Sequence, residues 1–259
     1  MRNWLRHFLP YGVVRARQIA NQLARLGISP HRSRRLALRP DIGQMLIRSN
    51  LHLLPDGALA NLEWVIDVGA NAGDWTADLL TLCQPARVVL VEPDPRMAEG
   101  LRQRFAGMAL VEIVETALGS AEGSAELHIM TASVFNSFRL PDVRLAQMYG
   151  QSSRVKETVN VTVRTVDSLA GGIPRVSLLK IDVQGSEREV LSGAEQTLRK
   201  TDLIILEVNF QPHYEGEAGF LELDGILQHH GFRIGNYSAP KGTSHEAFYA
   251  DALYVRRDR

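Results

Sequence analysis

Two observations predict an α/β protein whose mostly parallel sheet binds a nucleoside. The first is an apolar run at residues 63–68, followed by the turn Gly69-Ala70-Asn71-Ala72-Gly73 and a helix-compatible segment. A strand, a glycine turn and a helix in this order place helix N-terminal amides over the carboxyl end of a sheet. The second is an apolar run at residues 87–91 that ends in Glu92-Pro93. An acid there can accept hydrogen bonds from both hydroxyls of a ribose, so the two runs together predict a nucleoside site.

The other elements are recognised from apolar runs separated by turn residues. Pro95 suits the first turn of a helix, which places a helix directly after the second strand. The last two strands are expected to form an antiparallel hairpin at the edge of a seven-stranded, Rossmann-like sheet with helices on both faces. In chain order we expect a helix from residue 73, a helix at 95–106, strands at 110–114 and 176–182, a helix at 187–198, a strand at 202–208, a helix at 220–230, and strands at 231–237 and 247–255.

An insertion at residues 123–164 interrupts the alternation of helix and strand. Its two ends, 124–130 and 158–164, alternate apolar and polar side chains in the manner of half-buried strands. Its centre, residues 131–153, is rich in Ser, Asn and Arg. An insertion over the cofactor face is typical of a substrate lid, and an ordinary surface excursion is the alternative.

The glycine turn favours S-adenosylmethionine over a dinucleotide. A dinucleotide-binding turn would need glycine at positions 69, 71 and 74, where this chain has Gly69, Asn71 and Asp74. Asp74 at the start of the helix would repel a pyrophosphate. S-adenosylmethionine carries no phosphate, and its ammonium group suits a nearby carboxylate such as Asp67. We therefore expect this cofactor, and an NAD-dependent oxidoreductase is a weaker alternative.

A third segment indicates the type of reaction. Residues 177–194 form a strand, a Lys-x-Asp-x-x-Gly-x-Glu turn and a helix that contains Val-Leu-Ser-Gly-Ala. This segment resembles that of FkbM-type methyltransferases, in which the turn is Lys-Ile-Asp-Val-Glu-Gly-x-Glu; Gln184 here replaces the usual acid. The resemblance covers residues 62–254 and includes the glycine turn, Glu92-Pro93, the Ala-Leu-Gly of residues 117–119, and Leu206-Glu207. It implies a class I methyltransferase sheet, S-adenosylmethionine as the cofactor, and O-methyl transfer.

Ligands of open α/β sheets lie beyond the carboxyl ends of the strands, where this chain places several acids. Asp67 and the glycine turn should hold the methionine end of the cofactor, and Glu92 should hold the ribose. Residues 115–117 are expected beside the adenine. The expected cofactor-binding residues are therefore Asp67, Gly69, Asn71, Gly73, Glu92, Pro93, Thr116 and Ala117.

Methyl transfer to an alcohol needs a base that removes the hydroxyl proton. Asp182 at the end of its strand is the first choice, and His213 beyond the next strand is the alternative, because histidine titrates near neutral pH. Lys180 lies on the same side of its strand as Asp182, so it should pair with Asp182 or Glu207; a structural salt bridge is the other interpretation. Asp182, Glu207 and His213 could bind Mg²⁺, but no contiguous ligand motif is present and we expect no obligatory metal.

The resemblance implies that the acceptor is a sugar hydroxyl of a glycan, a glycolipid or a secondary metabolite. A catalytically silent binding or scaffold protein that keeps the fold is the alternative. Nucleic acid is not expected as a partner, because the basic residues cluster in one arm and do not line the predicted cleft. Acceptor contacts are expected in the insertion and in residues 209–219, from Phe135, Asn136, Arg139, Gln211, His213 and Tyr214.

Charge is distributed unevenly along the 259 residues, although the formal net charge is zero. The first forty residues hold nine Arg and no acid, which leaves 20 basic side chains against 29 acidic ones in the rest. Apolar side chains share one side of the helices expected in this region: Trp4, Leu5, Phe8 and Leu9, continued loosely by Val13, Ile19, Leu23 and Leu26. We therefore divide the chain into a basic amphipathic arm, residues 1–54, and a methyltransferase domain, residues 55–259.

The arm leaves three interpretations open: packing on the domain with a solvated basic face, contact with an anionic membrane or a lipid-linked substrate, and contact with a second copy. Arginines at 15, 17 and 25 argue against a signal peptide, and no apolar run reaches the roughly 20 residues of a membrane-spanning helix. Cys83 is the only cysteine, so no internal disulfide can form. The expected location is the reducing cytoplasm, with peripheral membrane contact through the arm as an open addition.

Overall fold

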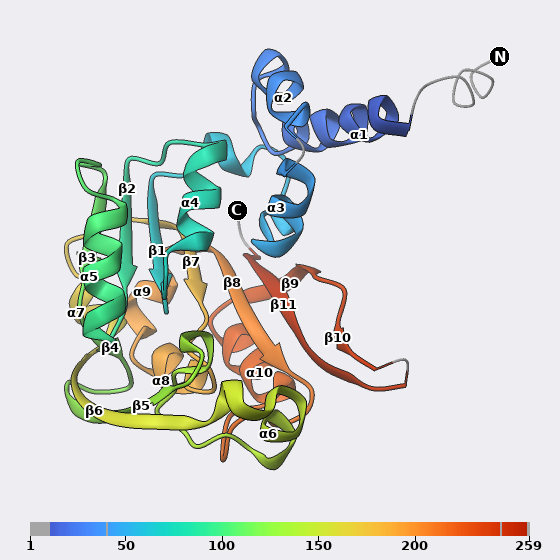
Figure 1. The fold of residues 1–259 in the computed structure, drawn as a ribbon. Coiled ribbons are helices and arrows are strands. Elements are labelled where there is room, and N and C mark those ends of the chain that lie inside the picture. The colour runs from blue at the N-terminus through green and yellow to red at the C-terminus, as the bar shows by residue number, and fades with distance from the viewer. Residues whose placement is uncertain (1–10, 40, 244, 258–259) are drawn as a thin grey trace.

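One mixed sheet forms the centre of the molecule (Figure 1). The computed structural model describes residues 11–39, 41–243 and 245–257, and within these ranges eight strands form the sheet in the order β10-β11-β8-β7-β1-β2-β3, with β9 also paired to β11. The strands are β1 Trp64–Val68, β2 Arg87–Val91, β3 Val111–Val114, β7 Val176–Ile181, β8 Thr201–Asn209, β9 Phe232–Tyr237, β10 Lys241–Gly242 and β11 Ala247–Arg256. Strands β1, β2, β3, β7 and β8 are parallel to one another, and β11 is antiparallel to β8 and β9. The predicted sheet and its antiparallel hairpin are confirmed, and β10 adds one short strand to the seven expected.

Helices cover both faces of this sheet. Side chains alternate along each strand, so Ile66 and Leu179 point to one face, while Val65 and Leu178 point to the other. The first pair belongs to a buried cluster with α7 to α10, and the second pair to a cluster with α4, α5 and the N-terminal helices. The helices of the domain are α4 Asp74–Leu82, α5 Pro95–Arg104, α7 Val166–Leu169, α8 Glu187–Ser192, α9 Glu195–Arg199 and α10 Phe220–His229.

One expected helix is divided in two. The sequence predicts a single helix at 187–198, but α8 and α9 are separated by Gly193 and Ala194. A Cβ atom on Gly193 would lie 2.0 Å from the carbonyl oxygen of Gly119, so the chain at this point is pressed against the turn that enters the insertion. The prediction of a continuous helix is wrong, because the helical pattern carries no information about this backbone contact.

The insertion forms a small second sheet at the carboxyl ends of the main strands (Figure 1). Its strands β5 and β6 are antiparallel, and β4 pairs in parallel with β6. Leu127, Ile129 and Val161 are buried in its own apolar cluster, against which Phe138 packs. The two predicted half-buried strands are confirmed. The elements are β4 Ala117–Leu118, β5 Gly123–Met130, α6 Val143–Tyr149 and β6 Val155–Arg164.

The N-terminal helices lie at the opposite end of the sheet from the insertion (Figure 1). Leu23 and Leu26 are buried in the same cluster as Val65, and Arg32 donates a hydrogen bond of 3.1 Å to the carbonyl oxygen of Thr81, near the end of α4. The described part of the arm therefore packs on the domain. Within the described ranges, no helix has the length and apolar character needed to cross a membrane. These helices are α1 Tyr11–Arg25, α2 Pro30–Ala37 and α3 Ile42–Arg48; the predicted apolar positions Trp4, Leu5, Phe8 and Leu9 lie outside the described residues.

Candidate active site

A left-handed glycine turn joins β1 to α4 and brings two strand ends together. Gly69 has a φ of 76°, and a Cβ atom there would lie 1.9 Å from the backbone oxygen of Asp182. Both the conformation and the close approach exclude a side chain, so only glycine fits. The turn after β1 therefore touches the turn after β7. This contact brings the predicted cofactor turn and the predicted base into one place.

Glu92, directly after β2, binds the backbone of two neighbouring turns. Its carboxylate accepts hydrogen bonds from the N–H of Asn71 at 2.7 Å and from the N–H of Asp94 at 2.9 Å. Glu92 is 5% exposed, and burial raises its pKa to about 7. The acid that the sequence predicts beside the ribose thus also fixes the turns around it.

Lys180 connects β1 to the turn after β7. Its Nζ lies 3.0 Å from Asp67 Oδ1 and 3.5 Å from Asp182 Oδ2, and it donates to the backbone oxygen of Gly69 at 3.1 Å. Burial lowers the pKa of Lys180, but the two carboxylates outweigh burial and raise that pKa above its usual value. Thr76 donates a further hydrogen bond to Asp67 at 2.8 Å. The predicted pair of Lys180 with Asp182 is present, and Asp67 is a closer partner.

Two side chains fix the turn after β7. Glu187 accepts hydrogen bonds from the N–H groups of Val183 and Gly185, both at 3.2 Å. Gln184 has a left-handed φ of 54°, and its Nε2 donates to Asp182 Oδ1 at 2.7 Å. Glu187 is 3% exposed, and burial raises its pKa to about 7. Asp182 is therefore oriented by a hydrogen bond as well as by its ion pair.

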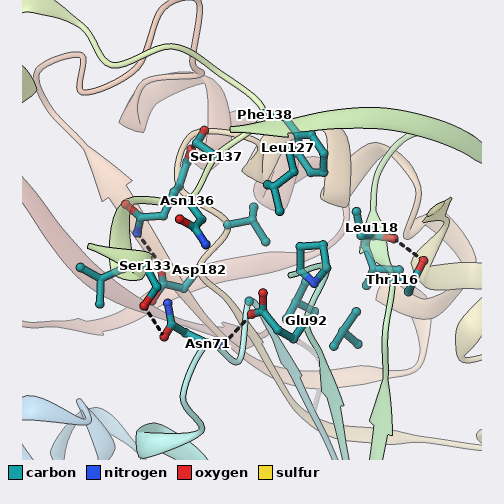
Figure 2. A pocket seen from close by; sticks show the side chains of 18 residues that line it. Asn71, Glu92, Thr116, Leu118, Leu127, Ser133, Asn136, Ser137, Phe138 and Asp182 are labelled. Atoms are coloured by element: carbon teal, nitrogen blue, oxygen red, sulfur yellow. Dashed lines mark hydrogen bonds between the residues drawn. The ribbon is translucent and has the colours of Figure 1, made fainter. Parts of the chain in front are cut away.

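A cavity of about 160 Å³ lies between these turns and the insertion. Figure 2 shows Glu92 and Asn71 on one side of it, and Leu127 and Phe138 together on another. The side chain of Asp182 is 37% exposed. Apolar walls with a few convergent polar groups are typical of a small-molecule site. The cavity is lined by Val68, Gly69, Asn71, Val91, Glu92, Pro93, Thr116, Ala117, Leu118, Leu127, Ser133, Val134, Asn136, Ser137, Phe138, Asp182, Val183 and Gln184.

The insertion is hydrogen-bonded to the turns on which the cavity is built. Each turn receives one side-chain bond: Ser133 Oγ to Asn71 Oδ1 at 3.2 Å, Asn136 Nδ2 to Asp94 Oδ2 at 3.2 Å, and Ser137 Oγ to the carbonyl oxygen of Gln184 at 2.6 Å. Residues 133–138 consequently form one wall of the cavity. Their position is set by polar contacts with the turns after β1, β2 and β7.

The predicted cofactor residues fall into two groups. Asp67 is fully buried under the glycine turn and does not line the cavity, and Gly73 does not line it either. Thr116 lines it, but its hydroxyl donates to the backbone oxygen of Thr162 at 3.0 Å. The predicted residues that do line it are Gly69, Asn71, Glu92, Pro93, Thr116 and Ala117.

Of the three predicted catalytic residues, Asp182 lines the cavity, whereas Lys180 and His213 do not. Lys180 lies behind Asp182 as its ion-pair partner. His213 is 4% exposed, and its ring packs edge-on against Tyr249 with centroids 5.3 Å apart. Burial lowers the pKa of His213, and its Nε2 has no hydrogen-bond partner among the described residues.

Among the six predicted acceptor contacts, Asn136 lines the cavity and the other five do not. Tyr214 is 1% exposed, and its hydroxyl donates to Gln184 Oε1 at 2.9 Å. Arg139 is paired with Glu189 at 2.8 Å. Sequence reasoning missed the lining residues Leu118, Leu127, Ser133, Val134, Ser137 and Phe138. Only the alternation of β5 could have indicated Leu127, since the others lie in short or irregular segments.

Acids continue from the cavity along the neighbouring strand ends. Glu207 in β8 is the register partner of Asp251 in β11. Burial and the nearby Asp182 raise the pKa of Asp251 to about 6, and burial with both aspartates raises that of Glu207 well above its usual range. No three or more His, Cys, Asp or Glu side chains in the described ranges are arranged to hold a metal ion. Burial therefore favours neutral carboxyl groups beside Asp182.

Comparison with known families matches residues 67–234 to the Methyltransferase FkbM domain. The chain belongs to this family. The match begins at Asp67 and includes every turn of the cavity and the whole insertion. It confirms the resemblance that the turn after β7 indicates, and membership of this family makes S-adenosylmethionine the cofactor.

Relatives and a solved structure agree with this assignment. The chain is 29% identical over 172 residues to 2-O-methyltransferase NoeI of Sinorhizobium fredii, a match that covers 63% of this chain and 69% of that protein. It is 25% identical over 166 residues to Methyltransferase sdnD of Sordaria araneosa, covering 53% and 64% respectively. The crystal structure of Methyltransferase FkbM from Methylobacillus flagellatus has the same fold, with a TM-score of 0.53 at 16% identity, covering 94% of this chain and 59% of that one. The chain thus spans about three fifths of the solved protein.

Proposed function

We propose that this FkbM-family protein transfers a methyl group from S-adenosylmethionine to a sugar hydroxyl of a glycan, a glycolipid or a secondary metabolite. The observation that carries the proposal is that Glu92 and Asp182, at the carboxyl ends of β2 and β7, line the same cavity. The relative from Sinorhizobium fredii is by name a 2-O-methyltransferase, which supports oxygen as the receiving atom. A silent scaffold and an NAD-dependent oxidoreductase are the weaker candidates, because family membership favours methyl transfer.

The residues of the cavity fit S-adenosylmethionine. Glu92 presents a buried carboxylate that suits the ribose hydroxyls, and Thr116 and Ala117 border the space for adenine. The turn with Gly69 and Asn71 borders the methionine end, and the close approach of Gly69 to the backbone oxygen of Asp182 fixes its position. When bound, the cofactor supplies a methyl group already activated on a sulfonium. The protein's task is therefore to align the acceptor hydroxyl and remove its proton.

In this proposal Asp182 takes the acceptor proton. Its carboxylate reaches the cavity, while Lys180 and Gln184 hold it in one orientation. A base must lie within hydrogen-bond reach of the proton it removes. His213 is the less supported base, because it lies outside the cavity lining. Lys180 acts as a positioning residue that keeps the acid in place.

We also propose that the insertion is the substrate lid. Residues 133–138 form one wall of the cavity, and among the described residues only three side-chain hydrogen bonds, to Asn71, Asp94 and Gln184, hold this wall against the turns after β1, β2 and β7. For the arm, the buried Leu23 and Leu26 support packing on the domain. Peripheral membrane contact and contact with a second copy stay predictions for its basic outer side, where Arg34 and Arg35 are exposed.

The test combines calorimetric titration of S-adenosylhomocysteine with transfer of a labelled methyl group to a panel of glycosides. Glu92→Gln should weaken binding of S-adenosylhomocysteine by roughly tenfold or more, since a hydrogen bond to a charged group contributes about 1.5–3 kcal/mol. Asp182→Asn should bind it nearly as well as the wild type but transfer methyl at least about a hundredfold more slowly. Asp74→Asn is the matched control, because the carboxylate of Asp74 lies at the start of α4 and does not line the cavity. This variant should change neither the affinity for S-adenosylhomocysteine nor the rate of methyl transfer.

Two results would contradict the proposal. If a demonstrably folded protein fails to bind S-adenosylhomocysteine, the protein is not a methyltransferase and the whole proposal is wrong. If the label appears on nitrogen or carbon and on no hydroxyl, the protein is a methyltransferase but the proposed transfer to oxygen is wrong. Binding of NAD in place of the homocysteine analogue would instead support the oxidoreductase.

A further inference from the structure

Exposed apolar side chains are concentrated in the insertion, which forms one wall of the cavity. Within the described ranges eleven large apolar side chains are exposed, and six of them lie between residues 134 and 155 or directly after β8. Single exposed apolar residues are ordinary on protein surfaces, but a local concentration indicates an interaction site. We call the four that belong to the centre of the insertion the insertion patch: Val134, Leu140, Val143 and Met148.

One residue of the insertion patch also belongs to the cavity. Val134 both lines the cavity and is 56% exposed, so its side chain has one side on each surface. The ring of its neighbour Phe135 lies 4.7 Å from that of Tyr149, centroid to centroid. This contact joins the cavity wall to α6, which carries the outer half of the patch.

The patch is a supported surface and not a loose loop. Helix α6 buries Leu145 and leaves Val143 65% exposed. Its N-terminal end is fixed by a 2.7 Å hydrogen bond from the N–H of Asp142 to the carbonyl oxygen of His213. The N–H of Glu215 donates to the carbonyl oxygen of Leu140 at 3.0 Å. The apolar side chains are therefore carried by a segment that backbone hydrogen bonds attach to residues 213–215.

The two surfaces differ in the chemistry that they can bind. The cavity offers polar groups from Glu92, Asn136 and Asp182, which suit a hydroxyl-bearing group. The insertion patch offers aliphatic side chains, which gain free energy only by covering apolar atoms. A free sugar would use the first surface and leave the second exposed to water.

We propose that the acceptor is an amphiphile. Its hydroxyl-bearing head enters the cavity, and its hydrocarbon portion lies along the insertion patch. This inference rests on the proposed function and narrows its substrate class to alkyl- or acyl-linked sugars.

The experiment measures how affinity depends on hydrocarbon length. Hexyl, heptyl and octyl glucosides, kept below their critical micelle concentrations, are titrated into the full-length protein saturated with S-adenosylhomocysteine. Each methylene that becomes buried should tighten binding by up to about fourfold, and glucose itself should bind far more weakly. The double variant Val143→Ser/Met148→Ser, at two exposed positions, should flatten this dependence. Ile47→Ser, at a position on α3 that is 62% exposed, is the matched control and should preserve it.

The possible failures are distinguishable. If the wild type binds S-adenosylhomocysteine but shows no dependence on chain length, or if the double variant keeps the full dependence, the amphiphile is wrong and the proposed function survives. If the folded protein binds no S-adenosylhomocysteine, the proposed function itself fails. A wild-type dimer in light scattering that Val143→Ser/Met148→Ser converts to a monomer would assign the patch to a second copy and overturn the inference.

Discussion

Glu92 and Glu187 occupy equivalent places in two turns of the site. Each is almost fully buried, and each accepts two backbone N–H groups. Such bonds fix a turn, because they satisfy amides that no strand or helix uses. Burial nevertheless penalises the charge, and the pKa of both acids rises to about 7. The site thus gains ordered turns at the cost of two carboxylates that are easily protonated near neutral pH.

We expect Glu187→Gln to stabilise the protein at alkaline pH. The folded-state pKa of Glu187, about 7, is raised above the usual value of 4.5, so the folded state binds the proton more tightly than the unfolded chain. Stability from this group is therefore complete below about pH 4.5 and is lost as the pH rises from there through about 7. The neutral variant avoids that loss, and its free energy of unfolding at pH 8 should be higher by up to about 3 kcal/mol.

Urea unfolding of both proteins at pH 5 and pH 8 checks this expectation. The advantage of Glu187→Gln should fall to below about 1 kcal/mol at pH 5, where the acid is protonated in the folded state and the unfolded chain is only just above its own pKa. Glu112→Gln, an exposed acid on β3, should behave like the wild type at both values. An advantage that is the same at pH 5 and pH 8 would mean that the burial of charge is not its cause.

Asp67 illustrates how far single residues of the site could be predicted. The strand pattern correctly placed Asp67 at the end of β1, but it did not identify Lys180 as the partner of Asp67. Lys180 reaches it because the two are register partners in adjacent parallel strands. Register between strands more than a hundred residues apart depends on the assembled sheet, and no local pattern encodes it. The lining residues Ser133 and Ser137 escaped prediction for a similar reason, since side-chain bonds to distant turns fix their positions.

At the scale of elements, segments with a continuous apolar pattern were predictable to within a few residues. Strand β7 and helix α10 are examples, because burial on both sides of a strand and on one side of a helix leaves a local signature. The division between α8 and α9 was not predictable. It depends on the contact of Gly193 with Gly119, two residues that are distant in sequence.

We expect Gly193→Ala to destabilise the protein by about 1–3 kcal/mol. The added Cβ would meet a backbone oxygen at 2.0 Å, and a backbone group cannot move aside without displacing β4. Gly225 in the middle of α10 is the matched control, because a Cβ there meets nothing within 4 Å. Gly225→Ala should raise stability by about 0.5–1 kcal/mol through helix propensity.

Thermal or urea unfolding of the two alanine variants measures both effects. Opposite signs for Gly193→Ala and Gly225→Ala are the expected result. If Gly193→Ala were neutral or stabilising, the interruption between α8 and α9 would not depend on close packing with the insertion.

At the scale of the whole molecule, the arm and the domain share one apolar core. Leu23 of α1 is fully buried in the same cluster as Val65 of β1 and Leu178 of β7. The exposed side of the arm carries Arg34 and Arg35, whereas its inner side completes one face of the sheet. Unfolding of the arm should therefore be coupled to unfolding of the sheet.

Leu23→Ala should lower the free energy of unfolding by about 2–5 kcal/mol, the usual loss for a large buried aliphatic side chain. Leu38→Ala provides the matched control in the same arm, because Leu38 is 76% exposed, and it should have little effect. Far-ultraviolet circular dichroism and tryptophan fluorescence should report one coincident transition for each protein. A separate early transition in Leu23→Ala would show that the arm unfolds on its own.

The same cluster also has a consequence for synthesis on the ribosome. Leu23 leaves the exit tunnel early, but Leu253 of β11, which belongs to the same cluster, follows only after nearly all of the sheet has been translated. The inner side of α1 therefore has no complete partner for most of the time that translation takes. During that interval a nascent chain exposes apolar leucines that become buried only later, and transiently exposed apolar surface of this kind is prone to aggregation.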